Sequence, residues 1–259
     1  MIKIKAENEN GDLIDLSSQL GFVLVSVTGL TPPTSAINTS TLATKDGSLY
    51  NSSKMNNRNI VLTIKPVWRV EATRVNLYKY IKSKKYIKLY LKTDSRDVYI
   101  EGYVESFDGD LYELGQTLQV SIICPDPYFI KKTAETYNFA SQVVTVTNSS
   151  DFETGCQITL NITGAAENVT ITNSATGETF IFKQALENGD KVTIDTRRGK
   201  KKLRLTRGGT TTNIINTIDT AHTTWLQMIP GNNALTITAD SGAANIGGSV
   251  KIQPIYEGL

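Results

Sequence analysis

The sequence predicts a mainly β protein of two domains, with one helix in the first. Three observations lead to this prediction. Short runs of alternating apolar and polar residues, typical of half-buried strands, occur in both halves of the chain. One segment of the first half has the spacing of an amphipathic helix. The length of 259 residues fits two domains of about 100–150 residues each.

The middle of the chain contains the stretch SIICPDPYFI, which combines a strand with a stop signal. In the segment 118–124, apolar residues occupy every second position. Pro125 and Pro127 have no amide N–H to donate to a β ladder, so the strand ends there or becomes an edge. We therefore place the seam between the domains here, with domains of residues 1–133 and 134–259.

The first domain is predicted to contain strands in the runs FVLVSVTGL, NIVLTIKP, YIKLYL and DVYIEGYV. A helix is expected over residues 71–85. Its lysines gather at the C-terminal end, where the helix dipole favours cations. The predicted apolar stripe of this helix consists of Val75, Leu77, Tyr78 and Ile81.

A long polar stretch covers residues 30–59 of the first domain. It contains too few apolar residues to build a core of its own. A segment of this length inside a compact domain is more often an interaction loop than a simple connection. We expect a functional arm or interaction loop here.

The second half is predicted to be entirely β. Turn signals such as ENGD, RRGK and PGNN separate its short strands at the spacing of a β-sandwich. Alternate residues such as Ile158, Leu160 and Ile162 supply the apolar inner face. The predicted strands are QITLNIT, NVTITN, ETFIFK, KVTIDT, KLRLTR, ALTITA and SVKIQP.

Composition gives no general argument for a nucleic-acid or membrane partner, because 27 basic residues face 25 acidic ones. The segment MIKIKAENENGDLIDL lacks the apolar run of a signal peptide, and no stretch approaches the roughly 18 apolar residues of a membrane span. We expect synthesis in a cytosol and no membrane partner. Cys124 and Cys156 are expected to be buried small hydrophobic residues rather than a disulfide or metal pair.

Catalytic motifs are missing from the sequence, which contains no nucleophile elbow, zinc-protease helix or phosphate-binding loop. His222 is expected to be a surface or cap residue. Asp108, Asp110 and Glu113 could form a calcium loop or a carboxylate pair, but they lack the full spacing of a calcium loop. We favour a solvated hairpin turn around Gly109. The sequence thus predicts a protein that is not an enzyme and has no cofactor or metal.

Two basic clusters allow alternative interpretations. In residues 78–92, lysines alternate with tyrosines, as on surfaces that bind single-stranded nucleic acid. We favour a solvated face or a protein interface, with the tyrosines divided between helix and sheet, and we expect no specific nucleic-acid partner. Residues 197–207 centre on a turn at Gly199 and form either an electrostatic docking patch or a solubilising loop.

The first half contains, in order, the segments VTGLTPP, KDGSLYNSSKMNNRNIVLTI, EATRVNLYKYIKSKK and YIEGYVESFDGDLYELGQTLQVSIICPDPYF. The most specific parts are the exit CPDPYF and a segment that contains Asp46, Gly47, Ser48, Tyr50 and Arg58. In this order and spacing the four segments resemble the N-terminal hub domain of the distal tail proteins of long-tailed bacteriophages, the siphophage tail family. The resemblance covers residues 1 to about 133.

The second half resembles the peripheral galectin-like sandwich of the same family. WLQMIPGNNALTI and SVKIQPIYEGL are similar to its closing strands. Trp225 is a candidate glycan contact, but the clustered His, Asn, Arg and Trp of true galectins are missing. Because Leu226, Met228 and Ile229 lie beside it, we favour Trp225 as a core residue.

The resemblance implies a fold and a function. The fold is an N-terminal β-sandwich or barrel-like hub domain with one helix, followed by a galectin-like β-sandwich. The function is that of a structural virion protein at the phage tail tip, assembled in the host cytoplasm. Its partners would be itself in a homohexameric ring, the tail tube protein and the tail-associated tip protein, with receptor-binding proteins as further candidates.

Asp46, Tyr50 and Arg58 are candidate ring-interface residues, because they match the family's motif. Ring closure requires heterologous interfaces, and a polar arm or an exposed strand edge is suited to them. We therefore expect the stretch 30–59 to contact neighbouring subunits. The alternative is a carbohydrate-binding module that attaches a tail or an enzyme to the host cell wall. A wall hydrolase is disfavoured because the sequence offers no plausible acid/base pair.

Overall fold

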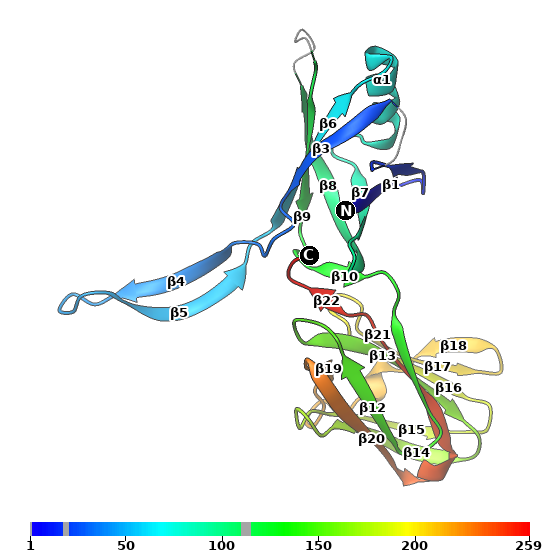
Figure 1. The fold of residues 1–259 in the computed structure, drawn as a ribbon. Coiled ribbons are helices and arrows are strands. Elements are labelled where there is room, and N and C mark those ends of the chain that lie inside the picture. Colours follow the sequence, from blue (N-terminus) through cyan, green and yellow to red (C-terminus); the bar gives the residue numbers. More distant parts are fainter. Residues whose placement is uncertain (1, 18–20, 110–114) are drawn as a thin grey trace. The chain divides into compact units, whose positions relative to one another are not determined.

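The structure, a computed structural model, describes residues 2–17, 21–109 and 115–259, and in it the chain divides into two compact units (Figure 1). Unit 1 consists of Met1–Lys132 and Tyr256–Leu259, and unit 2 consists of Thr133–Ile255. Each unit has its own hydrophobic core. The protein is mostly strand with one α-helix in the described residues, which confirms the predicted fold class.

Unit 1 contains one long sheet with the strand order β2-β1-β7-β8-β9-β6-β3. Neighbours along this order pair antiparallel. Two further short strands belong to this sheet: β10 pairs with β8, and β22 pairs with β10. The strands are β1 (Lys3–Asn8), β2 (Leu13–Asp15), β3 (Phe22–Thr28), β6 (Arg58–Pro66), β7 (Tyr86–Lys92), β8 (Asp97–Gly109), β9 (Leu118–Cys124), β10 (Phe129–Lys131) and β22 (Ile255–Tyr256).

The sheet of unit 1 curls around its core. In β6 and β9 every second side chain is buried, as the two-residue period of a half-buried strand requires. Helix α1 (Val70–Tyr80) contacts both β1 and β6, which lie near opposite ends of the strand order. A sheet whose two ends meet the same helix is strongly curved. Unit 1 therefore has the predicted barrel-like form with one helix.

Helix α1 is shorter than the predicted segment 71–85. It ends at Tyr80, and Ile81 already has extended backbone angles. Of the predicted apolar stripe, Leu77 and Ile81 are buried, whereas Val75 and Tyr78 are exposed. The reason is that α1 touches the core mainly through Leu77, while the Tyr78 ring packs edge-on against Phe107 with centroids 4.8 Å apart.

Residues between β3 and β6 form a separate hairpin of β4 (Ser35–Thr41) and β5 (Ser48–Met55). In the described part of the chain these two strands pair only with each other. Figure 1 shows them as an extended two-stranded ribbon. We call this hairpin, residues 35–55, the arm.

Unit 2 is a β-sandwich. One sheet has the order β11-β21-β13-β16-β17-β18 with β19 beside β13, and the other has the order β12-β20-β14-β15. Apolar residues of both sheets form one core, as in the predicted galectin-like sandwich. The elements are β11 (Glu135–Phe139), β12 (Val143–Asn148), β13 (Thr154–Ile162), β14 (Ala166–Asn173), β15 (Thr179–Leu186), β16 (Lys191–Asp195), β17 (Lys202–Arg207), β18 (Thr210–Asn213), η1 (Ile215–Thr217), β19 (Gln227–Met228), β20 (Gly231–Ser241), η2 (Ala243–Asn245) and β21 (Ile246–Ile252).

The two cysteines are free and buried, Cys124 in unit 1 and Cys156 in unit 2. Burial raises the pKa of both thiols to about 12, so both stay protonated at neutral pH. This confirms the prediction that they act as small hydrophobic residues.

No helix within residues 2–17, 21–109 and 115–259 is long and apolar enough to cross a membrane. Within the same ranges, no group of three or more His, Cys, Asp or Glu residues could hold a metal ion.

Candidate functional site: the arm and its anchor

The arm forms strands although it has almost no buried side chain. Hydrogen bonds between side chains of the facing strands hold it together. Asn38 Nδ2 donates to Ser52 Oγ at 3.0 Å, and Asn51 Nδ2 donates to Ser40 Oγ at 2.6 Å. Cross-strand pairs of this kind explain why a polar, Asn- and Ser-rich sequence folds as a hairpin instead of a loop.

Apolar side chains of the arm are exposed. Ile37 is 64% exposed, Leu49 54% and Tyr50 65%. Tyr50 lies opposite Thr39, on the same face of the hairpin as Ile37, whereas Leu49 lies opposite Ser40 on the other face. An isolated two-stranded hairpin is marginally stable in water, and exposed apolar groups favour association. The arm is therefore suited to bind another protein surface along both faces.

Two of the three candidate interface residues belong to the surface of the arm. Asp46 lies in the exposed turn between β4 and β5. Tyr50 lies in β5, where its hydroxyl is 2.8 Å from Ser53 Oγ. Both side chains are available to a neighbouring molecule, and their contact with another subunit stays a prediction.

Arg58, the third candidate, is inside unit 1 and only 2% exposed. Its Nε donates to Pro127 O at 2.7 Å, and its Nη1 donates to Gly29 O at 2.5 Å and Thr31 O at 2.6 Å. Its Nη2 donates to Glu257 O, and the guanidinium carbon lies 4.4 Å from the centroid of the Phe129 ring.

The environment of Arg58 is that of a buried cation surrounded by carbonyl oxygens. Burial lowers the pKa of Arg58 from its ordinary value, while the neighbouring Cys124 and Glu257 act in the opposite direction. An arginine side chain nevertheless stays charged in proteins. Its fork of N–H groups can bind several carbonyls at once, which a lysine cannot do in the same geometry.

Arg58 anchors the arm base, which we define as residues 29–34 and 56–60. Gly29 and Thr31 lead into the arm, and Arg58 itself begins the strand that follows it. Within the subunit Arg58 is a structural anchor, and we do not include it in the proposed interface. A sequence motif cannot distinguish an exposed arginine from one that is enclosed by main-chain carbonyls.

Gly29 makes the close approach at the arm base possible. Its φ of +82° is in the left-handed region, and a Cβ there would lie 2.0 Å from Asn59 O. No other residue type fits this turn without moving the start of β6. The backbone geometry of this turn thus explains why a glycine stands at this position of the segment VTGLTPP.

A second exposed region lies at the β3 end of the sheet. Val23 and Val25 are both more than half exposed, and no charged residue occurs within β3. Val67 and Trp68, also exposed, follow β6 and donate their main-chain N–H groups to Gly21 O at 2.8 and 3.2 Å. Strand edges without charged residues or proline readily pair with other strands. Sequence reasoning did not single out this edge, because β3 was interpreted simply as an apolar strand.

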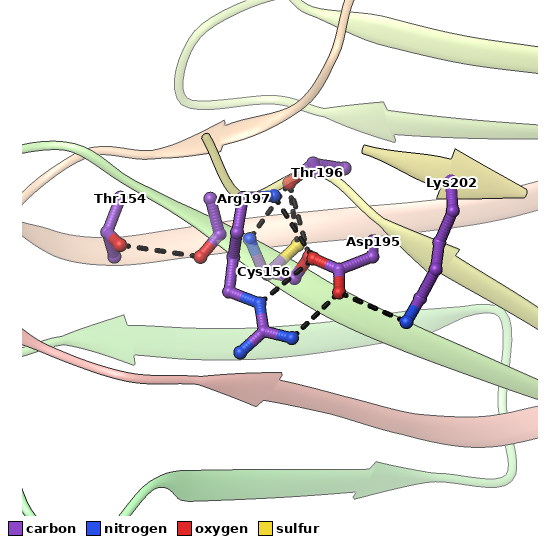
Figure 2. Close-up of polar contacts among 7 residues, drawn as sticks. Thr154, Cys156, Asp195, Thr196, Arg197 and Lys202 are labelled. Carbon is purple, nitrogen blue, oxygen red and sulfur yellow. Dashed lines mark hydrogen bonds and ion pairs between the residues drawn. The ribbon is translucent and has the colours of Figure 1, made fainter. Parts of the chain in front are cut away.

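The basic segment 197–207 is partly neutralised by a buried carboxylate (Figure 2). Asp195 is fully buried and accepts hydrogen bonds from Arg197 Nε at 2.9 Å and Arg197 Nη2 at 2.7 Å. Lys202 Nζ lies 3.8 Å from Asp195 Oδ2. Burial alone would raise the pKa of Asp195, but the Arg197 hydrogen bonds and the two positive charges outweigh it, so the pKa is lowered.

The lysine and tyrosine cluster of residues 78–92 is divided between the end of helix α1, the turn after it and strand β7. Tyr90 and Tyr99 form a cross-strand pair with ring centroids 6.1 Å apart. Lys88 Nζ lies 3.9 Å from the centroid of the Tyr99 ring and 3.6 Å from Glu101 Oε1. These pairs occupy the aromatic faces that a nucleic-acid surface would offer for base stacking.

Trp225 packs against the core of unit 2. Its ring lies 5.2 Å from the Phe180 ring, centroid to centroid, and Lys201 Nζ lies 5.3 Å from the Trp225 centroid. The favoured interpretation as a packing residue agrees with this position.

His222 is exposed and its Nδ1 lies 3.2 Å from Asp219 Oδ1, as expected of a surface residue.

Strands β8 and β9 pair antiparallel as a hairpin, as expected near Gly109. Gly109 is the last residue of β8 and pairs with Leu118 of β9, so it belongs to the strand and not to the turn. Asp108 is exposed and accepts a hydrogen bond from Ser106 Oγ at 2.7 Å. Asp110 and Glu113 lie outside the described residues.

Comparison with protein families gives a match within unit 2. Residues 149–252 match the family described as "Siphovirus-type tail component, C-terminal domain". This segment is a siphovirus tail-component domain. It lies within unit 2, so the match agrees with the resemblance seen in the sequence. A search of curated proteins found no match.

Solved structures with a similar fold cover almost the whole chain. The SPP1 Dit (gp 19.1) protein, described as a paradigm of the hub adsorption apparatus in phages infecting Gram-positive bacteria, matches with a TM-score of 0.77 and 12% identity, over 97% of this chain and 98% of that one. Chains of the phage P2 baseplate, in its activated conformation with Ca or with Sr, match with TM-scores of 0.59 and 0.60 and 11% identity, over 100% of both chains. The chain therefore shares the fold of these proteins across both units.

Proposed function

We propose that this protein is the hub at the distal end of a siphovirus tail. Six copies form a closed ring that joins the tail tube protein to the tail-associated tip protein, and receptor-binding proteins attach to the same assembly. The family match and the fold shared with the SPP1 and P2 proteins support a tail or baseplate hub. The protein acts structurally in the virion, after assembly in the host cytoplasm, and not as an enzyme.

The observation that carries the ring proposal is the exposed arm. A closed ring is built from heterologous contacts, in which one surface of each subunit meets a different surface of the next. The arm offers exposed Ile37, Leu49 and Tyr50, and the β3 edge offers a strand without charged residues. We assign the arm to intersubunit contact, with Asp46 and Tyr50 as interface residues.

The experiment is to replace residues 35–55 with a short Gly-Ser linker and to compare the variant with the unchanged chain by light scattering and negative-stain electron microscopy. We expect a ring with a central channel from the unchanged chain and monomers from the variant. Circular dichroism and thermal unfolding serve to show that both units of the variant are folded.

A milder triple variant, Ile37→Ser, Leu49→Ser and Tyr50→Ser, keeps the hairpin and removes its apolar side chains. Val143→Ser, at an exposed position of β12 in unit 2, is the matched control and should assemble normally. Intact rings from the linker variant would refute the role of the arm. Failure of the unchanged chain to form rings, even with tail tube and tip proteins present, would refute the hub proposal.

A further inference from the structure

The segment Tyr256–Leu259 follows unit 2 in the sequence but belongs to unit 1. We call it the return segment. Tyr256 is buried in the core of unit 1, and the guanidinium carbon of Arg96 lies 4.3 Å from the centroid of its ring. Arg96 Nη1 also donates a hydrogen bond to Gly258 O. The side chain of Tyr256 and the main chain of Gly258 thus hold the segment at two points.

The return segment also contacts the residues that lead into the arm. Leu259 N donates to Leu30 O at 3.1 Å. Gly258 packs so closely against Pro32 that a Cβ on Gly258 would lie 3.0 Å from Pro32 Cδ. These contacts are made to residues on the N-terminal side of the arm.

Arg58 joins the return segment and the arm base through one side chain. The same guanidinium donates to Glu257 O of the return segment and to Gly29 O and Thr31 O of the arm base. Because the guanidinium is planar and rigid, the positions of these acceptors depend on one another. Loss of the Glu257 carbonyl would leave a buried N–H group without this acceptor and allow the fork to rotate.

We propose that the return segment is a built-in ligand of unit 1 that holds the arm base in one conformation, with Arg58 as the positioning residue. Residues 133–255 lie between the two in the sequence, so the arm base is completed only after unit 2 has been synthesised. An ordered arm base thus marks a chain that has both domains. The link to assembly rests on the proposed function, in which the arm makes the ring contacts.

Hydrogen exchange of the arm-base amides tests the proposal, with the unchanged full-length protein as the reference. Three variants perturb the contact between the return segment and the arm base: a chain that ends at Ile255, Arg58→Lys, and Gly258→Val, whose larger side chain is directed at Pro32. We expect the arm-base amides to exchange at least about tenfold faster in each, the effect of losing a charge-assisted hydrogen bond. Exchange in β13 of unit 2 should stay unchanged. Arg204→Lys, at an exposed position of β17, is the matched control.

A peptide rescue separates this role from a general loss of stability. A synthetic peptide with the sequence Ile-Tyr-Glu-Gly-Leu, added to the chain that ends at Ile255, should restore slow exchange at the arm base. The same peptide with Ala in place of Tyr should not. If truncation instead accelerates exchange throughout unit 1, Arg58→Lys and Gly258→Val decide the question, since both retain Tyr256 in the core. Unchanged exchange of the arm base in these two variants would overturn the proposal.

The two proposals fail in different ways. If the unchanged chain forms no ring, the hub proposal fails, but the exchange experiment still tests the return segment. If the truncated chain shows a loosened arm base and still forms rings at the normal rate, the link between the return segment and assembly is wrong. Accelerated exchange together with slower ring formation in all three variants supports both.

Discussion

Arg58 is a buried cation whose guanidinium binds four main-chain carbonyls and the face of Phe129. The residues that supply these carbonyls are far apart in the sequence, from Gly29 to Glu257. One side chain at the start of β6 therefore determines how three separate segments, around Gly29, Pro127 and Glu257, meet in unit 1. Its cost is the desolvation of a charge, which the carbonyl oxygens and the aromatic face offset.

Replacement of Arg58 by Met should lower the free energy of unfolding of unit 1 by about 3 kcal/mol or more, because several buried carbonyls would lose their donor together. Calorimetry, with hydrogen exchange of β6 to assign the transition, measures the effect. Arg204→Met, at an exposed position of unit 2, should change stability by about 0.5 kcal/mol at most. An equally small effect at Arg58 would mean that the carbonyls find water as a substitute.

Trp225 allows a test between packing and glycan binding. Because its ring contacts Phe180 and is only partly buried, Trp225→Ala should destabilise unit 2 by roughly 2–3 kcal/mol, somewhat less than a fully buried aromatic residue. Thermal unfolding measures this, with Trp68→Ala in unit 1 as the control. A glycan array should show no binding that depends on Trp225. Saturable binding that Trp225→Ala abolishes would instead favour the carbohydrate-binding module.

The β3 edge is the element most open to strand addition. Its outward-facing Val23 is 52% exposed, so a polar residue there loses little packing in the isolated subunit. Val23→Lys should leave the unfolding temperature within about 2 °C of the unchanged protein, since surface substitutions have small effects. It should also reduce ring formation, because a lysine on an edge strand disfavours pairing with another strand.

Light scattering and thermal unfolding of the same sample check both parts of this expectation. Val143→Lys, on an exposed position of β12, controls for the added charge. Normal assembly of the Val23 variant would show that the β3 edge is not part of the ring interface. In that case the partner surface of the arm has to be sought elsewhere on unit 1.

Local patterns predicted the elements whose burial is decided by neighbours in the sequence. Strand β9 was expected because apolar residues alternate up to Cys124 and prolines follow, and both effects are local. The arm was expected because a long polar stretch cannot form a core. Helix α1 was predicted too long, because the lysines after Tyr80 fit a helix end but Lys84 has a left-handed backbone.

Long-range contacts explain what the sequence did not reveal. The buried state of Arg58 depends on carbonyls of segments that are distant in the chain, and no local pattern records them. The return of Tyr256 to unit 1 is of the same kind, since the predicted strand SVKIQP does not indicate where the residues after it pack. Asp195 likewise becomes a buried ion-pair partner only through the fold of β16 and β17.

At the scale of the whole molecule, the two units have separate cores, and two buried carboxylates of unit 2, Asp190 and Asp195, have lowered pKa values. For Asp190 the main cause is the hydrogen bonding by Arg207, whose Nη2 lies 2.6 Å from Asp190 Oδ2. For Asp195 the donors from Arg197 overcome the effect of burial. Both groups therefore link the stability of unit 2 to pH.

The sign of this linkage follows from the lowered pKa values. Above the ordinary carboxyl pKa of 3.8, both groups are ionised in the folded and the unfolded chain, and their stabilising contribution is complete. Below that pH the unfolded chain binds protons first, so the contribution is lost as the pH falls through the lower pKa values of the folded state. We expect the unfolding temperature of unit 2 to fall steeply in this range.

Asp195→Asn should lower the free energy of unfolding of unit 2 at pH 7 by roughly 1–3 kcal/mol, because hydrogen bonds to a charge are lost. It should also flatten the fall of the unfolding temperature at low pH. Calorimetry from pH 7 down to pH 3, with the exposed Asp94→Asn as control, measures both effects; an unchanged pH profile in the Asp195 variant would show that other groups determine the acid sensitivity of unit 2.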